Sequence, residues 1–208
     1  TRVRSSAASD VYKRQVIKAG IDALEQYGAG AGASPLIGGH NFLHEQLEQE
    51  IAHFLKNEYA ITYTSGYAAN CSTLLAMMDK EDIAIMDMFT HASVFDGCLC
   101  TNTKRFLHNN IDSLVHVLNN SKNFKNRFVI IDGVYSQDGD IAFLDQIYAV
   151  CKEHDAFLIV DDAHGIGVLG KTGRGIIEDY GLLDKVDMIT GTFSKAFGCV
   201  GGYAIARK

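Results

Sequence analysis

The sequence predicts an α/β domain built on a mostly parallel sheet of seven strands with helices on both faces. Three observations lead to this prediction: short apolar runs recur along the chain, helical patterns separate most of them, and polar residues follow their carboxyl ends. The apolar runs are residues 60–63, 83–86, 105–107, 128–132, 157–161, 188–192 and 203–206.

One amphipathic helix is clear before the first strand, because apolar residues recur at helical spacing from Leu43 to Leu55 within residues 41–57. Further helical patterns cover residues 68–78, 92–99, 111–118 and 144–154, with a shorter one at 175–180. Strands that alternate with helices in this way form βαβ units, whose sheet is buried on both faces.

The chain divides into three parts by composition. Residues 1–15 are polar and aperiodic, and we expect a non-native or disordered tail there. Residues 16–40 form an N-terminal lead-in that includes a flexible Gly/Ala-rich loop at 28–39. Residues 41–208 make up the large domain.

Composition narrows the class of protein. A chain of 208 residues that is 47% hydrophobic can bury a substantial core, and its net charge of -6 argues against a nucleic-acid partner. The five cysteines form no CxxC pair and no Cys/His ligand spacing, so we expect reduced thiols, no metal site and a cytoplasmic location. No apolar run approaches the roughly 20 residues of a membrane span.

One motif suggests a different class of enzyme. Residues 165–172 read GIGVLGKT, which matches the phosphate-binding P-loop of nucleotide hydrolases. However, Gly173 and Gly175 occupy the first turn of what should be a substantial helix, and no later strand ends in the acid that a second magnesium ligand requires. We therefore disfavour the NTPase interpretation.

Lys195 is the first candidate for catalysis. It lies in GTFSKAFG (191–198), just past an apolar strand and between small and hydroxyl residues, where an amine can be desolvated and its pKa lowered. A Schiff-base lysine requires such a pKa. The alternative is an ordinary surface lysine in a loop between strands.

Asp161 is the second candidate. In VDDAHG (160–165), two acids and a histidine end an apolar strand, where free carboxylates are costly unless a cation meets them. A protonated pyridine nitrogen would be such a partner, which assigns Asp161 to a cofactor and Asp162 to a structural role. The alternative is an acid that caps a loop.

Two further segments could hold an aromatic, phosphorylated cofactor. TSGYAAN (64–70) joins a strand to a helix through Ser65 and Gly66, so the amides of Gly66 and Tyr67 could bind a phosphate, although a simple Ser N-cap explains the same residues. His91, in THAS, could lie flat against the cofactor ring or could be a capping residue.

In this order after SGYAAN, the segments DMFTHAS, FLHNN, DGVYSQDGD, VDDAHGIGVLGKTGRG and GTFSKAFG resemble the α-oxoamine synthases, which are fold type I enzymes that use pyridoxal 5'-phosphate (PLP). The resemblance runs from about Gly28 to the end. It implies the large domain of that fold, with its last strand antiparallel. It also implies a set of catalytic and cofactor-binding residues: Lys195 as Schiff base, Asp161 on the pyridine nitrogen, His91 on the ring, His164 and Ser136 beside the phenolic oxygen, Ser65, Gly66, Tyr67 and Thr192 around the phosphate, and Asn109 close to the site.

The resemblance implies a reaction that joins an amino acid to an acyl-CoA with loss of carbon dioxide, with Lys195 as base, in a homodimer. SGYAAN resembles the amino-oxononanoate synthase branch, whereas the glycine acetyltransferase, serine palmitoyltransferase and aminolevulinate synthase branches share nearly every other motif, so the branch stays open. A fold type I aminotransferase or lyase is also compatible with these motifs. A noncatalytic scaffold subunit would belong to a different class, and Lys195 argues against it.

Two positions depart from the pattern of the family. Asp132 stands where many relatives have Glu, and Pro35 stands where many carry Arg. The resemblance also implies a small C-terminal domain that binds the carboxylate of the amino acid. That domain is missing from a chain that stops at Lys208, so we expect the chain alone to be inactive.

Overall fold

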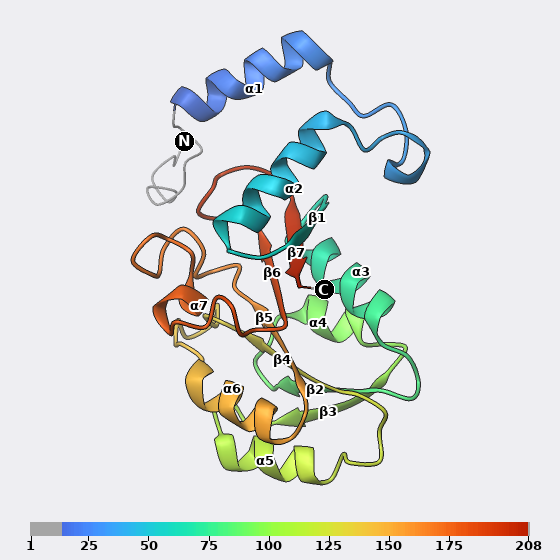
Figure 1. Cartoon of the computed structure of the whole chain (residues 1–208), viewed down its shortest axis with the longest axis vertical. Helices are drawn as coiled ribbons and strands as arrows, with labels where there is room; N and C mark the ends of the chain where they lie inside the picture. The colour runs from blue at the N-terminus through green and yellow to red at the C-terminus, as the bar shows by residue number, and fades with distance from the viewer. Residues whose placement is uncertain (1–13, 208) are drawn as a thin grey trace.

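The computed structural model describes residues 14–207 and contains the seven strands that the sequence predicts (Figure 1). The strands are β1 (Tyr59–Tyr63), β2 (Ile83–Asp87), β3 (Asn102–Phe106), β4 (Arg127–Asp132), β5 (Phe157–Asp161), β6 (Met188–Thr192) and β7 (Gly202–Ala206). The helices are α1 (Arg14–Tyr27), α2 (Phe42–Phe54), α3 (Gly66–Met77), α4 (Ala92–Gly97), α5 (Ile111–Asn119), α6 (Leu144–Glu153) and α7 (Ile176–Asp179), with a short 3-10 helix, η2, at Pro35–Ile37.

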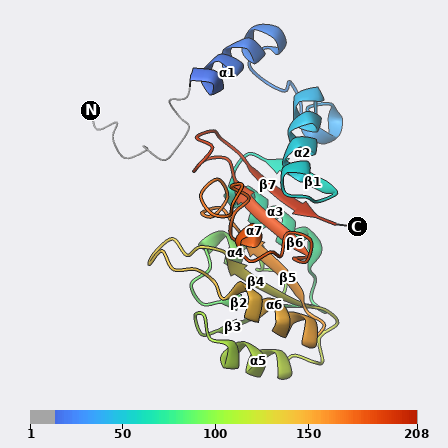
Figure 2. The ribbon, with the colours of Figure 1, turned by 60° about the vertical axis from the view of Figure 1, so that its left-hand side comes forward.

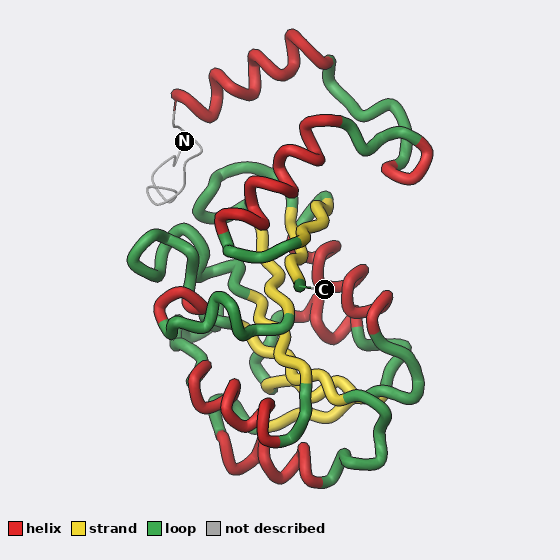
Figure 3. The backbone as a smooth tube through the Cα atoms, in the orientation of Figure 1, coloured by secondary structure: helices red, strands yellow, loops and turns green. Residues whose placement is uncertain are grey.

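All seven strands form one sheet in the order β1-β7-β6-β5-β4-β2-β3. β7 runs antiparallel to both of its neighbours, β1 and β6, and the other pairs are parallel. Figure 3 shows the strands running through the middle of the molecule with helices around them. The predicted mostly parallel sheet with an antiparallel last strand is therefore confirmed.

The sheet separates two apolar layers. Side chains alternate between them along each central strand: Val129 and Ile131 of β4 belong to the layer under α2, α5, α6 and α7, whereas Phe128 and Ile130 face α3 and α4. Because both faces are covered, the central strands read as continuous apolar runs, and this is why the sequence locates β5 and β6 at their observed bounds.

Side-chain caps fix where two of the helices begin. Asn41 accepts hydrogen bonds from the backbone N–H groups of Leu43 and His44 at the start of α2. At the start of α3, the Ser65 hydroxyl accepts the N–H of Ala68 at 3.0 Å. Each cap satisfies amides of a first turn that have no partner within the helix. Because Ser65 caps α3, this helix begins at Gly66, shortly after β1 ends at Tyr63.

Two elements differ from the sequence prediction. β3 begins at Asn102 rather than Arg105, because an edge strand can pair through exposed polar residues that give no apolar signal. The lead-in contains α1, a helix that we did not predict and that crosses the proposed boundary after residue 15. Ile17, Ile21 and Leu24 have helical spacing, but α1 buries none of its residues, and Figure 2 shows it apart from the sheet. The proposed tail otherwise lies outside the described residues.

Two further predictions concern the cysteines and membrane-spanning segments. The five cysteines are free thiols. Within residues 14–207, no helix is long and apolar enough to cross a membrane.

The contact between α3 and α4 leads to a test of the packing. A Cβ added at Gly97 would lie 3.0 Å from Cys71 Cα and 3.0 Å from Leu74 Cβ, so Gly97→Ala must push the two helices apart. We expect a loss of about 1–3 kcal/mol in the free energy of unfolding, measured by denaturant titration. Gly20→Ala in α1 is the control, since nothing lies within 4 Å of its added Cβ, and it should be neutral or stabilising. Equal stability of both variants would contradict the packing described.

Candidate active site

The carboxyl ends of the parallel strands enclose a cavity of about 250 Å³. The loops after β2, β5 and β6, the last residue of β4 and the first turn of α3 contribute to its wall, as expected for the ligand edge of such a sheet. Eight residues that the sequence singled out line it: Ser65, Gly66, Tyr67, His91, Asp161, His164, Thr192 and Lys195.

Lys195 and His164 face each other across this cavity. The Lys195 Nζ lies 2.9 Å from Nε2 of His164. Partial burial lowers the pKa of the Lys195 amine, although the carboxylates of Asp161 and Asp132 act in the opposite direction. Burial, together with the charge of Lys195, lowers the pKa of His164. The neighbourhood therefore favours a neutral imidazole beside an amine that releases its proton more readily than a free lysine.

Asp161 is a buried carboxylate at the end of β5, with hydrogen bonds to both oxygens. Asn70 of α3 donates to Oδ2 at 2.6 Å, and the backbone N–H of Ala163 donates to Oδ1 at 3.0 Å. Because the carboxylate is held from two sides, its direction is fixed at the wall of the cavity. It can meet a cationic ring nitrogen of a ligand there.

Asp162 has a separate environment. It is buried, and its Oδ2 accepts the N–H of Ile176 at 2.9 Å. An added Cβ at Gly165 or Gly175 would collide with this carboxylate, so both glycines are needed for its close packing. Burial raises the pKa of Asp162. These contacts support the structural role predicted for it.

The phosphate-binding candidates gather at the start of α3. Ser65 caps the helix, and the N–H groups of Gly66 and Tyr67 belong to the first turn, where the helix offers them no acceptor. A Cβ at Gly66 would lie 2.8 Å from Cβ of Thr192, so only glycine allows this approach. The Thr192 hydroxyl donates to the carbonyl of Gly201 at 2.8 Å. This corner can bind an anion.

His91 caps α4 and also lines the cavity, so its capping role is compatible with the predicted contact to a cofactor ring. Its Nδ1 accepts the N–H of Ser93 at 3.2 Å and lies 2.7 Å from the Ser93 hydroxyl. Its backbone N–H donates to Asp132 Oδ1 at 3.3 Å. The cap and the backbone contact fix the orientation of the imidazole at the wall.

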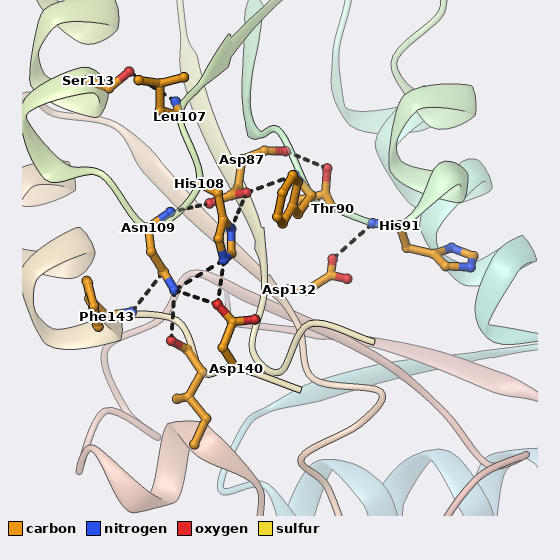
Figure 4. A network of polar contacts seen from close by, with 12 residues as sticks. Asp87, Thr90, His91, Leu107, His108, Asn109, Ser113, Asp132, Asp140 and Phe143 are labelled. Atoms are coloured by element: carbon orange, nitrogen blue, oxygen red, sulfur yellow. Dashed lines mark hydrogen bonds and ion pairs between the residues drawn. The ribbon is translucent and has the colours of Figure 1, made fainter. Parts of the chain in front are cut away.

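Asn109 and Ser136 do not line this cavity, unlike the other predicted cofactor residues. Asn109 belongs to a neighbouring group of polar side chains around Asp87 and His108 (Figure 4). Ser136 is exposed in a turn after β4. They lie away from the cavity because loop conformation, rather than the end of a strand, decides their positions, and their roles toward a cofactor stay predictions.

Sequence reasoning missed several polar residues of the site. Asn70 and Ser93 hold Asp161 and His91, and Asn70 also donates to the Ser93 hydroxyl at 2.9 Å. A signal for Asn70 was available, since it follows Gly66 by four residues and so lies on the same face of α3. No comparable signal marks Ser93, whose role depends on how α3 and α4 pack.

The P-loop match at 165–172 does not form a P-loop. The helix that follows, α7, has four residues, and the loop is closed by a bridge between Ile166 and Arg174. The Thr172 hydroxyl donates to Glu178 at 2.6 Å, and Lys171 is exposed. This geometry differs from that of a nucleotide-binding P-loop, in agreement with the prediction against an NTPase. Across residues 14–207, no group of three or more His, Cys, Asp or Glu side chains could hold a metal ion.

Comparison with known proteins agrees with this geometry. A model of the family described as aminotransferase class I and II matches residues 7–208. The chain belongs to this family. 8-Amino-7-oxononanoate synthase 1 of Bacillus subtilis (strain 168) is 42% identical over 196 residues, covering 93% of the chain and 50% of that protein. The corresponding synthase of Alkaliphilus metalliredigens (strain QYMF) is 43% identical over 192 residues, 91% of the chain and 49% of that protein.

Solved structures agree as well. Serine palmitoyltransferase from S. paucimobilis, with bound PLP and myriocin, superposes with a TM-score of 0.94 at 35% identity, covering 98% of this family member and 52% of that chain. 8-Amino-7-oxononanoate synthase from Francisella tularensis gives a TM-score of 0.80 at 27% identity, with 98% and 57% coverage. The resemblance to α-oxoamine synthases is confirmed, and the chain spans about half the length of these relatives.

The environment of Asp132 predicts a pH effect on stability. Burial, followed by repulsion from Asp161, raises the pKa of Asp132 to about 8. Its contribution to stability is present below the unfolded-state pKa of 3.8 and is lost as the pH rises through about 8. Asp132→Asn keeps an acceptor for the His91 N–H, so the variant should gain in Tm over wild type from pH 5 to 9 without PLP. If the curves of Tm against pH ran parallel for Asp132→Asn and wild type, this account would be contradicted. Asp138→Asn, at an exposed carboxylate, is the control and should track wild type.

Proposed function

We propose that this protein uses PLP to join an amino acid to an acyl-CoA with loss of carbon dioxide, as an α-oxoamine synthase of the 8-amino-7-oxononanoate synthase type. The observation that carries the proposal is the constellation in the cavity: an amine with a lowered pKa, Lys195, and a buried carboxylate, Asp161, line the same cavity. The named synthases that are 42–43% identical support it.

The residues of the cavity fit PLP. Asp161 is oriented by two hydrogen bonds and would meet the pyridine nitrogen. The first turn of α3 and Thr192, which Gly66 allows to approach each other closely, would hold the phosphate. Lys195 would bind the aldehyde carbon covalently, and His91, held by its bonds to Ser93, would lie on the ring. When bound, PLP supplies an electron sink for negative charge at the α-carbon of the amino acid.

The chain's own residues supply the proton transfers. Lys195 Nζ, with its lowered pKa, can take the α-proton once it is free of the aldehyde, and His164 at 2.9 Å can share a proton with it. Asp161, held at the cavity wall by Asn70 and Ala163, would accept a hydrogen bond from the protonated pyridine nitrogen. The amino acid's carbon nucleophile would then displace CoA from the thioester, and decarboxylation would give an α-amino ketone.

The choice of substrates within this class is part of the proposal. The synthase type is favoured by the identity to 8-amino-7-oxononanoate synthases. A serine palmitoyltransferase type is the second candidate, because several such structures superpose with TM-scores of 0.92–0.94. We also propose that the protein is a homodimer and that it is located in the cytoplasm, where free thiols such as those of its five cysteines stay reduced.

The activity can be tested with full-length protein, PLP, a panel of acyl-CoAs and single amino acids. We expect amino-acid-dependent release of CoA thiol and carbon dioxide in equal amounts. Lys195→Ala should lower the rate by at least about a hundredfold, because both the covalent contact and the base are lost. Lys171→Ala is the matched control at an exposed lysine and should keep full activity. Thiol release without carbon dioxide, or without need of an amino acid, would refute the proposed reaction.

A further inference from the structure

A second group of polar side chains lies beside the cavity, at the ends of β2, β3 and β4. Figure 4 shows His108 between two carboxylates. Its Nδ1 lies 2.9 Å from Oδ1 of Asp87, and its Nε2 lies 2.6 Å from Oδ2 of Asp140. Asp87 is fully buried at the end of β2, and Asp140 is partly exposed in the loop after β4.

The two carboxylate contacts favour the doubly protonated form of this histidine. A neutral imidazole carries one N–H, so it would turn the lone pair of its other nitrogen toward a carboxylate oxygen. The doubly protonated ring donates to both carboxylates. Burial opposes this charge, but the hydrogen bonds from Asp140 and Asp87 outweigh burial and raise the pKa of His108. The ionisable groups that face the ring are Asp87, Asp140 and Tyr135, whose ring meets it edge-on at 4.4 Å.

The same group holds the segment that leads to His91. Asp87 Oδ1 accepts the N–H of Phe89 at 2.9 Å, and the Asp87 carbonyl accepts the Thr90 hydroxyl at 2.9 Å. The Phe89 ring stacks on His108 with centroids 4.4 Å apart. Three residues of the segment are thus fixed just before His91, which lines the cavity.

Asn109 extends the group to a third segment. Its N–H donates to Asp87 Oδ2 at 3.0 Å, its side-chain amide donates to the Ile141 carbonyl at 3.0 Å, and its Oδ1 accepts the N–H of Phe143 at 3.3 Å. Asn109 adopts a φ of 49°, a conformation that asparagine tolerates better than most residues. The loops after β2, β3 and β4 are therefore joined through one cluster.

We propose that His108 is a positioning residue: as an imidazolium that links Asp87 and Asp140, it fixes the segment 87–90 and thereby the place of His91 at the cavity wall. His108 does not line the cavity, so it acts through His91. The part of this proposal that concerns PLP rests on the proposed function. The charge state of His108 and the position of His91 do not.

The first measurement is NMR of the histidine rings in full-length protein without PLP, with His108 assigned by its absence from His108→Gln. We expect both ring nitrogens of His108 to be protonated at pH 7.5 and the His91 signals to shift in the variant. A neutral His108 at this pH would overturn the proposal, as would unchanged His91 signals in folded His108→Gln. His116→Gln, on the exposed surface of α5, is the control and should leave His91 unaffected.

The second measurement separates positioning from general stability. In His108→Gln, we expect PLP affinity to fall by roughly tenfold, the order of loss seen when a partner that orients a binding histidine is removed, and the visible circular dichroism of bound PLP to weaken. Unchanged affinity and dichroism would overturn the positioning role. If wild-type protein binds no PLP, the proposed function fails, and the NMR result alone decides the present inference.

Asp140→Asn provides a second variant in case His108→Gln does not fold. It removes one carboxylate at a partly exposed position, so the pKa of His108 should fall toward the ordinary value of 6.5. We expect the pH dependence of the His91 signals in this variant to include a step that coincides with the titration of its His108, and this step should lie at lower pH than in wild type. His91 signals that do not respond to the charge of His108 would contradict the link.

Discussion

Asp161 carries a carboxylate into the interior at the end of β5, where its oxygens accept hydrogen bonds from Asn70 and from the backbone of Ala163. A charge at such a place is costly unless it is paired or hydrogen-bonded. The packing of α3 against the sheet brings Asn70 to this carboxylate, and the same helix presents its first turn to the cavity. One element therefore serves both ends of the proposed cofactor.

The sheet makes this arrangement possible. Parallel strands bring the ends of β2, β4, β5 and β6 to one edge, so the residues that end or follow these strands meet there. His164 and Lys195 face each other at 2.9 Å, although 31 residues separate them in sequence. Two layers of polar contacts result: one lines the cavity, and the group around His108 supports it from behind.

Much of this could be predicted from the sequence, because buried strands and strand-end residues leave strong signals. Apolar runs that end in polar residues predict the bounds of β5 and β6. They also predict that Asp161 and Lys195 lie at the same cavity. Ile17, Ile21 and Leu24 of α1 do have helical spacing, a signal that the prediction did not use, and none of the residues of α1 is buried. Ser93 and Asn109 could not be placed, since helix packing and a left-handed loop residue decide where they lie.

The most direct test of the account is to add PLP to purified full-length protein, trap it with borohydride and map the modified peptide by mass spectrometry. The account predicts one phosphopyridoxyl group, on Lys195, because this is the amine that lies within the cavity beside His164. Folded protein in which Lys195 stays unmodified, or in which an exposed lysine such as Lys171 is labelled instead, would contradict the central claim.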